Sequence, residues 1–194
     1  MSRFARIERI TKETSITVEL ELDGTGRANV DTGVGFYDHL LTTLAHHALF
    51  DLDLVGKGDL AIDDHHTVED TALALGAALD QALSDRVGIN RFGNASVPMD
   101  EALATAAIDI SGRPFAHIDL NLRSERIGNL TCQNIAHSLD AMARASNVTL
   151  HLTASGSNDH HVAEASFKAL ARALLMATSI DNRRQGLAST KGTL

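Results

Sequence analysis

The chain has 194 residues, of which 44% are hydrophobic and only 2 are proline, a composition typical of one domain with a substantial apolar core. Its formal net charge of -8 argues against nucleic acid as a partner, and its single cysteine, Cys132, excludes an internal disulfide and suits a reducing compartment. The opening segment MSRFARIERITKETS is polar, and no apolar run approaches the roughly 20 residues needed to cross a bilayer. We therefore expect a cytoplasmic protein with no membrane partner.

Four segments in the first half of the chain have the patterns of regular structure. SITVELELDGTG (15–26) alternates apolar and polar residues and ends in turn-forming residues, as a half-buried strand does. YDHLLTTLAHHA (37–48) predicts a helix, FDLDLVGKGD (50–59) predicts a second strand, and residues 66–84 predict a long helix. The long helix carries an apolar stripe at helical spacing, formed by Val68, Ala72, Leu75 and Leu79.

The second half repeats these segments in the same order. The matching segments are LATAAIDISGRP (103–114), IAHSLDAMARAS (135–146), VTLHLTASGSND (148–159) and a helix over 160–177 with the stripe Ala163, Phe167, Leu170 and Leu174. With one further strand ahead of the helix, each half is expected to read strand, strand, helix, strand, helix. We predict an internally duplicated α+β fold in which helices cover one face of each sheet and a pseudo-two-fold axis relates the halves. The single domain, residues 1–194, would consist of repeats at about 1–90 and 91–180 and a C-terminal tail at 181–194.

Two of the repeated segments contain adjacent histidines followed by a glutamate, IDDHHTVED and NDHHVAEAS. On an α-helix, residues four apart lie on the same side, whereas neighbours are about 100° apart. His65 and Glu69 can therefore hold one ion together, and so can His160 and Glu164. The second histidine of each doublet must serve another site, so the doublets suit two ions better than one.

One more histidine in each upstream helix, His39 or His137, completes two sets of three imidazoles and one carboxylate. One set is His65, Glu69, His137 and His161, and the other is His39, His66, His160 and Glu164. Such sets leave coordination positions open on an octahedral ion, as a catalytic metal requires. A lone His-His-x-x-Glu motif is more often a surface or core cluster, and a structural metal is a further alternative. The recurrence of the motif with its extra histidine favours two catalytic ions.

The motifs of this chain resemble those of the imidazoleglycerol-phosphate dehydratases, enzymes of histidine biosynthesis. The resemblance extends over nearly the whole chain, through RITKETSITVELELDGTG, GVGFYDHLLTTLAHHALFDL, GDLAIDDHHTVEDTALALG, GINRFG, DEAL, DISGRPF, DHHVAEASFKALARAL and STKG. It implies the duplicated fold, of the type found in domain 2 of ribosomal protein S5, and two manganese ions per active site held by the two ligand sets. It also implies a homo-oligomer of 24 subunits, with active sites between subunits.

The resemblance further implies a carbon–oxygen lyase that removes water from imidazoleglycerol phosphate to give imidazoleacetol phosphate. Two ions flanking the substrate ring would stabilise an imidazolate, which can expel the neighbouring hydroxyl group. The expected catalytic residues are Glu13, His65, Glu69 and Glu164. Of these, Glu13 is the candidate acid or base for the substrate side chain. The expected substrate contacts are Glu13, His39, His47, His65, His66, Arg91, Arg113, Ser189 and Lys191, the last four at the phosphate.

Two other functions remain compatible with so many histidines. A dimetal hydrolase of phosphorylated substrates would usually bridge its ions with carboxylates, whereas each set here has one glutamate. A metal-storage shell would explain the histidines but not Arg91, Arg113 and Lys191, which are expected around a small anion. The residues alone leave the metal open, because imidazole and carboxylate ligands accept several divalent ions.

Overall fold

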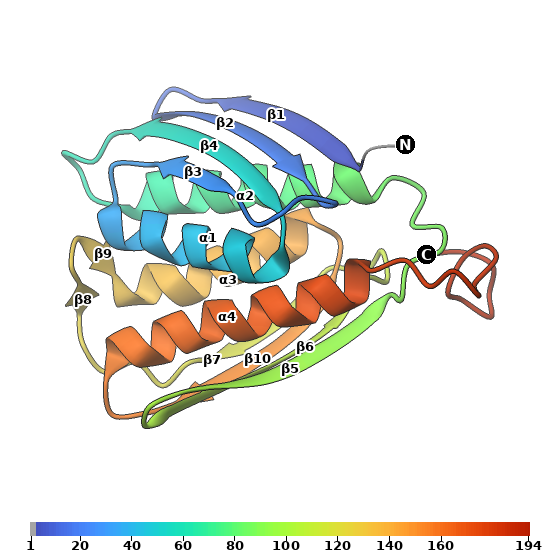
Figure 1. The fold of residues 1–194 in the computed structure, drawn as a ribbon. Coiled ribbons are helices and arrows are strands. Elements are labelled where there is room, and N and C mark those ends of the chain that lie inside the picture. The colour runs from blue at the N-terminus through green and yellow to red at the C-terminus, as the bar shows by residue number, and fades with distance from the viewer. Residues whose placement is uncertain (1–2) are drawn as a thin grey trace.

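The computed structural model describes residues 3–194 (Figure 1), in which two four-stranded sheets form the outer layers and four helices lie between them. The first sheet contains β1 (Phe4–Ile10), β2 (Thr14–Glu21), β3 (Ala28–Asp31) and β4 (Asp51–Gly58), and the second contains β5 (Phe92–Met99), β6 (Ala102–Asp109), β7 (Phe115–Asp119) and β10 (Thr149–Ser155). The helices are α1 (Gly35–Ala48), α2 (His65–Leu83), α3 (Cys132–Ala145) and α4 (Asp159–Thr178). A short hairpin, β8 (Arg126–Ile127) and β9 (Leu130–Thr131), precedes α3.

The two sheets have the same topology. Their strand orders are β1-β2-β4-β3 and β5-β6-β10-β7, and in each sheet the last pair is parallel while the others are antiparallel. In both halves the parallel pair is joined by a helix, α1 or α3, as a parallel connection requires. The predicted α+β duplication is confirmed.

The order predicted within each half was wrong because it omitted a third strand before the first helix, and in the second half it also omitted the β8–β9 hairpin. That strand is β3 in the first half and β7 in the second, with the sequences ANVD and FAHID. Each lies at the edge of its sheet and pairs only with β4 or β10. Segments this short carry little periodicity, so pairing with a neighbour rather than their own pattern makes them strands.

The predicted apolar stripes face the core. Val68 on α2 and Phe167 on α4 are buried, together with the other members of both stripes. α2 packs on β1 and β2, α4 packs on β5 and β6, and the pairs α1–α4 and α2–α3 bring the two halves together. One cluster of buried apolar side chains therefore spans both halves.

The four helices begin at the same end of the molecule. Figure 1 shows these starts on the left, where β4 leads into α2 and β10 leads into α4, whereas residues 179–194 lie at the opposite end. This arrangement brings the first turns of α1, α2 and α4 and the upstream half of α3 to one end, where both histidine doublets lie. Within the described residues, none of the helices is both long and apolar enough to span a membrane.

Candidate active site

The first histidine–glutamate cluster lies between α1 and the start of α4. Nε2 of His39 and Nε2 of His160 each lie 3.2 Å from Oε2 of Glu164. The Lys168 ammonium, one turn further along α4, lies 2.7 Å from Oε1 of the same carboxylate. Burial raises the pKa of Glu164, but hydrogen bonds from Lys168 and His39 outweigh it and lower the pKa to about 2. The carboxylate is therefore ionised at neutral pH and can bind a cation.

The second cluster joins α2 to α3. Oε1 of Glu69 lies 3.1 Å from Nε2 of His137, and Oε2 of Glu69 lies 3.8 Å from Nε2 of His65. The rings of His65 and His137 are stacked with their centroids 5.0 Å apart. Nδ1 of His65 lies 3.2 Å from Oδ1 of Asn134, which fixes the ring from its other side.

The donor atoms of both clusters suit a divalent cation. In each cluster, one nitrogen from each of two histidines and one glutamate oxygen all lie within 4.8 Å of one another. The buried Nε2 of His137 makes no hydrogen bond within residues 3–194, although a Glu69 oxygen lies nearby. Buried nitrogens rarely stay without a partner, and a metal ion would satisfy this one together with its carboxylate neighbour.

The second histidine of each doublet lies outside both clusters of its own chain. Nδ1 of His66 lies 3.0 Å from Oδ2 of Asp59, and Nδ1 of His161 lies 2.9 Å from Oε2 of Glu101. These hydrogen bonds raise the pKa of both histidines, and the bond from His161 lowers the pKa of Glu101 to about 2. The structure thus brings together three of the four residues in each predicted ligand set.

The four residues expected at the phosphate line one pocket of about 430 Å³, formed by the residue before β5, the turn after β6 and the tail. They are Arg91, Arg113, Ser189 and Lys191. Arg91 is held by Asp109, with distances of 2.6 and 3.0 Å, and by the carbonyl oxygen of Ala188 at 2.7 Å. The side chain of Arg113 is 68% exposed and lies 3.8 Å from Asp109. This pocket can bind an anion, and Arg113 is its most available guanidinium.

The anion pocket and the two clusters lie at opposite ends of the folded molecule. Glu101, beside His161, directly precedes β6, whereas Asp109, beside Arg91, ends it. An eight-residue strand spans about 26 Å at roughly 3.3 Å per residue. A ligand much shorter than this strand could not contact both ends of one copy.

The two remaining predicted site residues lie apart from the clusters. The side chain of Glu13, in the turn before β2, is 55% exposed, and its Oε2 lies 3.8 Å from Nδ1 of His66. His47 lies in the last turn of α1, two turns beyond His39. Burial lowers the pKa of His47, with further lowering by the charge of His46, so its ring is mainly neutral at neutral pH.

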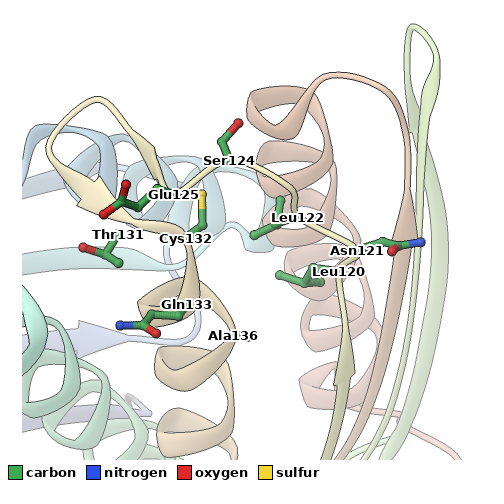
Figure 2. A pocket seen from close by; sticks show the side chains of 9 residues that line it. All are labelled: Leu120, Asn121, Leu122, Ser124, Glu125, Thr131, Cys132, Gln133 and Ala136. Atoms are coloured by element: carbon green, nitrogen blue, oxygen red, sulfur yellow. The ribbon is translucent and has the colours of Figure 1, made fainter.

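A separate pocket of about 490 Å³ lies beside the start of α3 (Figure 2). Leu120, Asn121 and Leu122 lie on one side of it, and Glu125, Thr131 and the first residues of α3 lie on the other. Cys132 lines it, and burial raises the pKa of this thiol, so it is protonated at neutral pH. None of the predicted site residues lines this pocket.

The residues that sequence reasoning missed around the clusters and the outer histidines include Asp59, Glu101, Asn134 and Lys168. Two of them left a signal. Glu101 occupies in the second repeat the place that Glu13 occupies in the first, and Lys168 follows Glu164 at the four-residue spacing of a helical ion pair. Asp59 and Asn134 come from loops and helix starts whose contacts depend on the tertiary fold.

Comparisons with known proteins agree with these features. The family model of imidazoleglycerol-phosphate dehydratase matches residues 32–174. An imidazoleglycerol-phosphate dehydratase of Streptomyces avermitilis is 52% identical over 197 residues, covering 100% of both chains, and one of Gluconacetobacter diazotrophicus is 52% identical over 195 residues, covering 100% of this chain and 98% of the relative.

Solved structures agree as well. The crystal structure of the Staphylococcus aureus dehydratase has a TM-score of 0.83 at 31% identity, covering 92% of this chain and 99% of its own. That of the Pyrococcus furiosus protein has a TM-score of 0.83 at 35% identity, covering 97% of this chain and 100% of its own. The full-length identity and the shared fold lead to one conclusion: the chain belongs to the imidazoleglycerol-phosphate dehydratase family of carbon–oxygen lyases.

Proposed function

We propose that this protein dehydrates imidazoleglycerol phosphate to imidazoleacetol phosphate in histidine biosynthesis, with two manganese ions in each active site. Family membership supports the substrate and the reaction. The two histidine–glutamate clusters support the binding of two ions. We further propose that the enzyme acts in the cytoplasm as a 24-subunit homo-oligomer.

The observation that carries the proposal is the distance between the anion pocket and the clusters. A phosphorylated imidazole is far shorter than the roughly 26 Å of β6 that separate them. One copy must therefore hold the phosphate while another holds the ring. Each cluster also lacks a fourth ligand, and His66 and His161 are the two histidines that a neighbouring copy could contribute. Both features support active sites shared between subunits.

The proposed ligand sets are His39, His66, His160 and Glu164 for one ion and His65, Glu69, His137 and His161 for the other. When bound, two cations would supply the positive charge that favours the deprotonated form of the substrate's imidazole ring. Three imidazoles and one carboxylate accept zinc as well as manganese, so the assignment of manganese rests on the family resemblance.

The chain's own side chains would bind and orient the rest of the substrate. Arg113 is exposed at the anion pocket, where its planar guanidinium can bind phosphate through two hydrogen bonds. Arg91 ties the tail to β6 through Ala188 and Asp109, which keeps Ser189 and Lys191 at the same pocket. Glu13, exposed beside His66, is the proposed group that moves the proton of the substrate side chain. Neutral His47 is a further proposed substrate contact.

The reaction is tested directly by incubating manganese-loaded protein with imidazoleglycerol phosphate and measuring the keto product. Formation of imidazoleacetol phosphate is expected. Folded, manganese-saturated protein that forms no product would contradict the proposal.

The sharing of sites between subunits has its own test. His65→Ala removes a metal ligand and Arg113→Ala removes a phosphate contact, so each variant alone should have little activity at low substrate concentration. Oligomers reassembled from a mixture of the two contain some sites in which both groups are intact. Activity should therefore recover on mixing, and a mixture no more active than its components would argue for sites within one chain.

A further inference from the structure

The two histidines that lie outside the clusters are each held by a carboxylate on the same ring atom. Nδ1 of His161 lies 2.9 Å from Oε2 of Glu101, and Nδ1 of His66 lies 3.0 Å from Oδ2 of Asp59. An ionised carboxylate only accepts hydrogen bonds, so Nδ1 must be the donor in both pairs. A neutral imidazole that donates through Nδ1 has its lone pair on Nε2. Each carboxylate therefore selects the form of the ring that can bind a metal through Nε2.

The two carboxylates come from different places in the repeat. Glu101 directly precedes β6, and its counterpart in the first half is Glu13, which directly precedes β2. Glu101 contacts its histidine, but Oε2 of Glu13 remains 3.8 Å from Nδ1 of His66, outside hydrogen-bond distance. Asp59 takes that position instead. The duplicated glutamates thus make different contacts.

The loops between the last strand and the last helix of each half explain the difference. Residues 59–64 join β4 to α2, and the first of them is Asp59. Only residues 156–158 join β10 to α4, and the sequence Gly-Ser-Asn there contains no carboxylate. In the second half the backbone N–H of Asn158 also donates to Glu101 at 2.8 Å, which fixes the glutamate against the short loop. The longer loop of the first half supplies a substitute carboxylate and releases Glu13.

We propose that Glu101 and Asp59 are positioning residues that orient His161 and His66 as Nε2 metal ligands, and that Asp59 thereby leaves Glu13 available to the substrate. This inference rests on the proposed metal-dependent function. It assigns different tasks to two glutamates that descend from one position of the duplicated unit: Glu13 acts on the substrate, and Glu101 acts through a ligand.

The test compares manganese binding by the intact protein and its variants, measured by calorimetry and by the electron paramagnetic resonance signal of free Mn²⁺. Glu101→Ala should weaken binding about 10- to 100-fold, the usual cost of losing a partner that orients a ligand. Glu101→Gln should restore most of the affinity, because its amide oxygen also accepts a hydrogen bond from Nδ1. If Glu101 mattered only through its negative charge, Glu101→Gln would bind manganese as weakly as Glu101→Ala.

Glu13→Ala is the matched control, since it changes the equivalent turn position in the other half. Its manganese affinity should stay within about twofold of that of the wild type, well short of the tenfold or greater loss expected for Glu101→Ala. It should nevertheless lose product formation. Unchanged manganese affinity in Glu101→Ala would overturn the inference. So would a loss of affinity in Glu13→Ala as large as that in Glu101→Ala.

The first half provides an independent pair of variants should Glu101→Ala fail to fold. Asp59→Ala in a Glu13→Ala background should weaken manganese binding, and Asp59→Asn in the same background should restore it. Equal affinities in these two variants would contradict the role of Asp59. Wild-type protein that neither binds manganese nor forms product would contradict the proposed function. An active wild type whose Glu101 and Asp59 variants keep the wild-type manganese affinity would contradict only the positioning roles.

Discussion

The two halves of the chain share a topology, but they place equivalent glutamates in different electrostatic surroundings. The Glu164 side chain is 12% exposed and its carboxylate is paired with Lys168 at 2.7 Å. The Glu69 side chain is 36% exposed, and the place equivalent to Lys168 one turn along α2 is occupied by Leu73. Duplication therefore preserved the histidine–glutamate clusters while allowing their neighbours to diverge. The two ions should differ in affinity even though their ligands are the same in kind.

At the end of the molecule away from the clusters, the two halves differ more. Arg91 precedes β5 and lines the anion pocket, whereas its counterpart Arg3 precedes β1 and is bound to Asp23 and to the carbonyl oxygen of Thr178. The tail residues Ser189 and Lys191 reach only the second-half pocket. The end with the histidine–glutamate clusters is thus duplicated, but the end with the anion pocket is not. Each of the following experiments challenges one part of this comparison.

The largest effect is expected from removing the glutamate carboxylate of either cluster. Glu164→Gln and Glu69→Gln should each abolish binding of one manganese ion per chain and lower the rate by at least about 100-fold, because a neutral amide is a poor substitute for a carboxylate ligand. Metal analysis of the purified variants measures the stoichiometry. If both variants retain two ions per chain, the matched ligand sets are wrong.

The next effect concerns the end that was not duplicated. Arg113→Ala should raise KM about 10- to 100-fold and change kcat much less, because it removes binding to a group remote from the reacting bond. Arg27→Ala is the control, since Arg27 is an exposed arginine close to the corresponding end of the first sheet, and its side chain is bound to Asp51. Steady-state kinetics should find the control unchanged. A similar KM for both variants and the wild type would remove Arg113 from the phosphate site.

A smaller effect is expected from the packing of strand on helix, which also differs between the halves. A Cβ added at Gly93 in β5 would lie 2.0 Å from the carbonyl oxygen of Ala173 on α4, whereas Ala5, its counterpart in β1, is an ordinary buried alanine. Gly93→Ala should lower the free energy of unfolding by about 1–3 kcal/mol through overpacking. Ala5→Gly should cost about 1 kcal/mol or less through added chain flexibility. Urea unfolding measures both, and a Gly93→Ala protein as stable as the wild type would show that α4 can move away without cost.

The smallest effect concerns Lys168 and depends on pH. The lowered pKa of Glu164 stabilises the folded protein above the ordinary glutamate pKa of about 4.5, and this contribution disappears as the pH falls toward 2. In metal-free protein, Lys168→Met should therefore reduce the thermal midpoint at pH 6–7, and the difference from the wild type should shrink below about pH 4.5. Leu73→Met, at the equivalent place in α2, should show no such dependence. A difference that stays constant from pH 7 to pH 3 would mean that the ion pair contributes nothing.

The sequence alone determined the duplication, the two sheet-and-helix halves and the three residues that gather in each cluster. These features depend on local periodicity, and the helical repeat fixes which side chains share a face, as it does for His160 and Glu164 or for His65 and Glu69. The stripes through Val68 and Phe167 were readable for the same reason. The short strands β3 and β7 and the β8–β9 hairpin escaped, because pairing with a neighbouring strand rather than any local pattern creates them.

Only the tertiary structure decided which partners the residues outside those helical faces contact. The lengths of the loops after β4 and β10 determine that Asp59 holds His66 whereas Glu101 holds His161. The run of β6 through the sheet separates the anion pocket from the clusters, which makes one chain insufficient for the proposed site. Such contacts join segments distant in sequence, and their geometry depends on the packing of whole elements rather than on the identity of the residues.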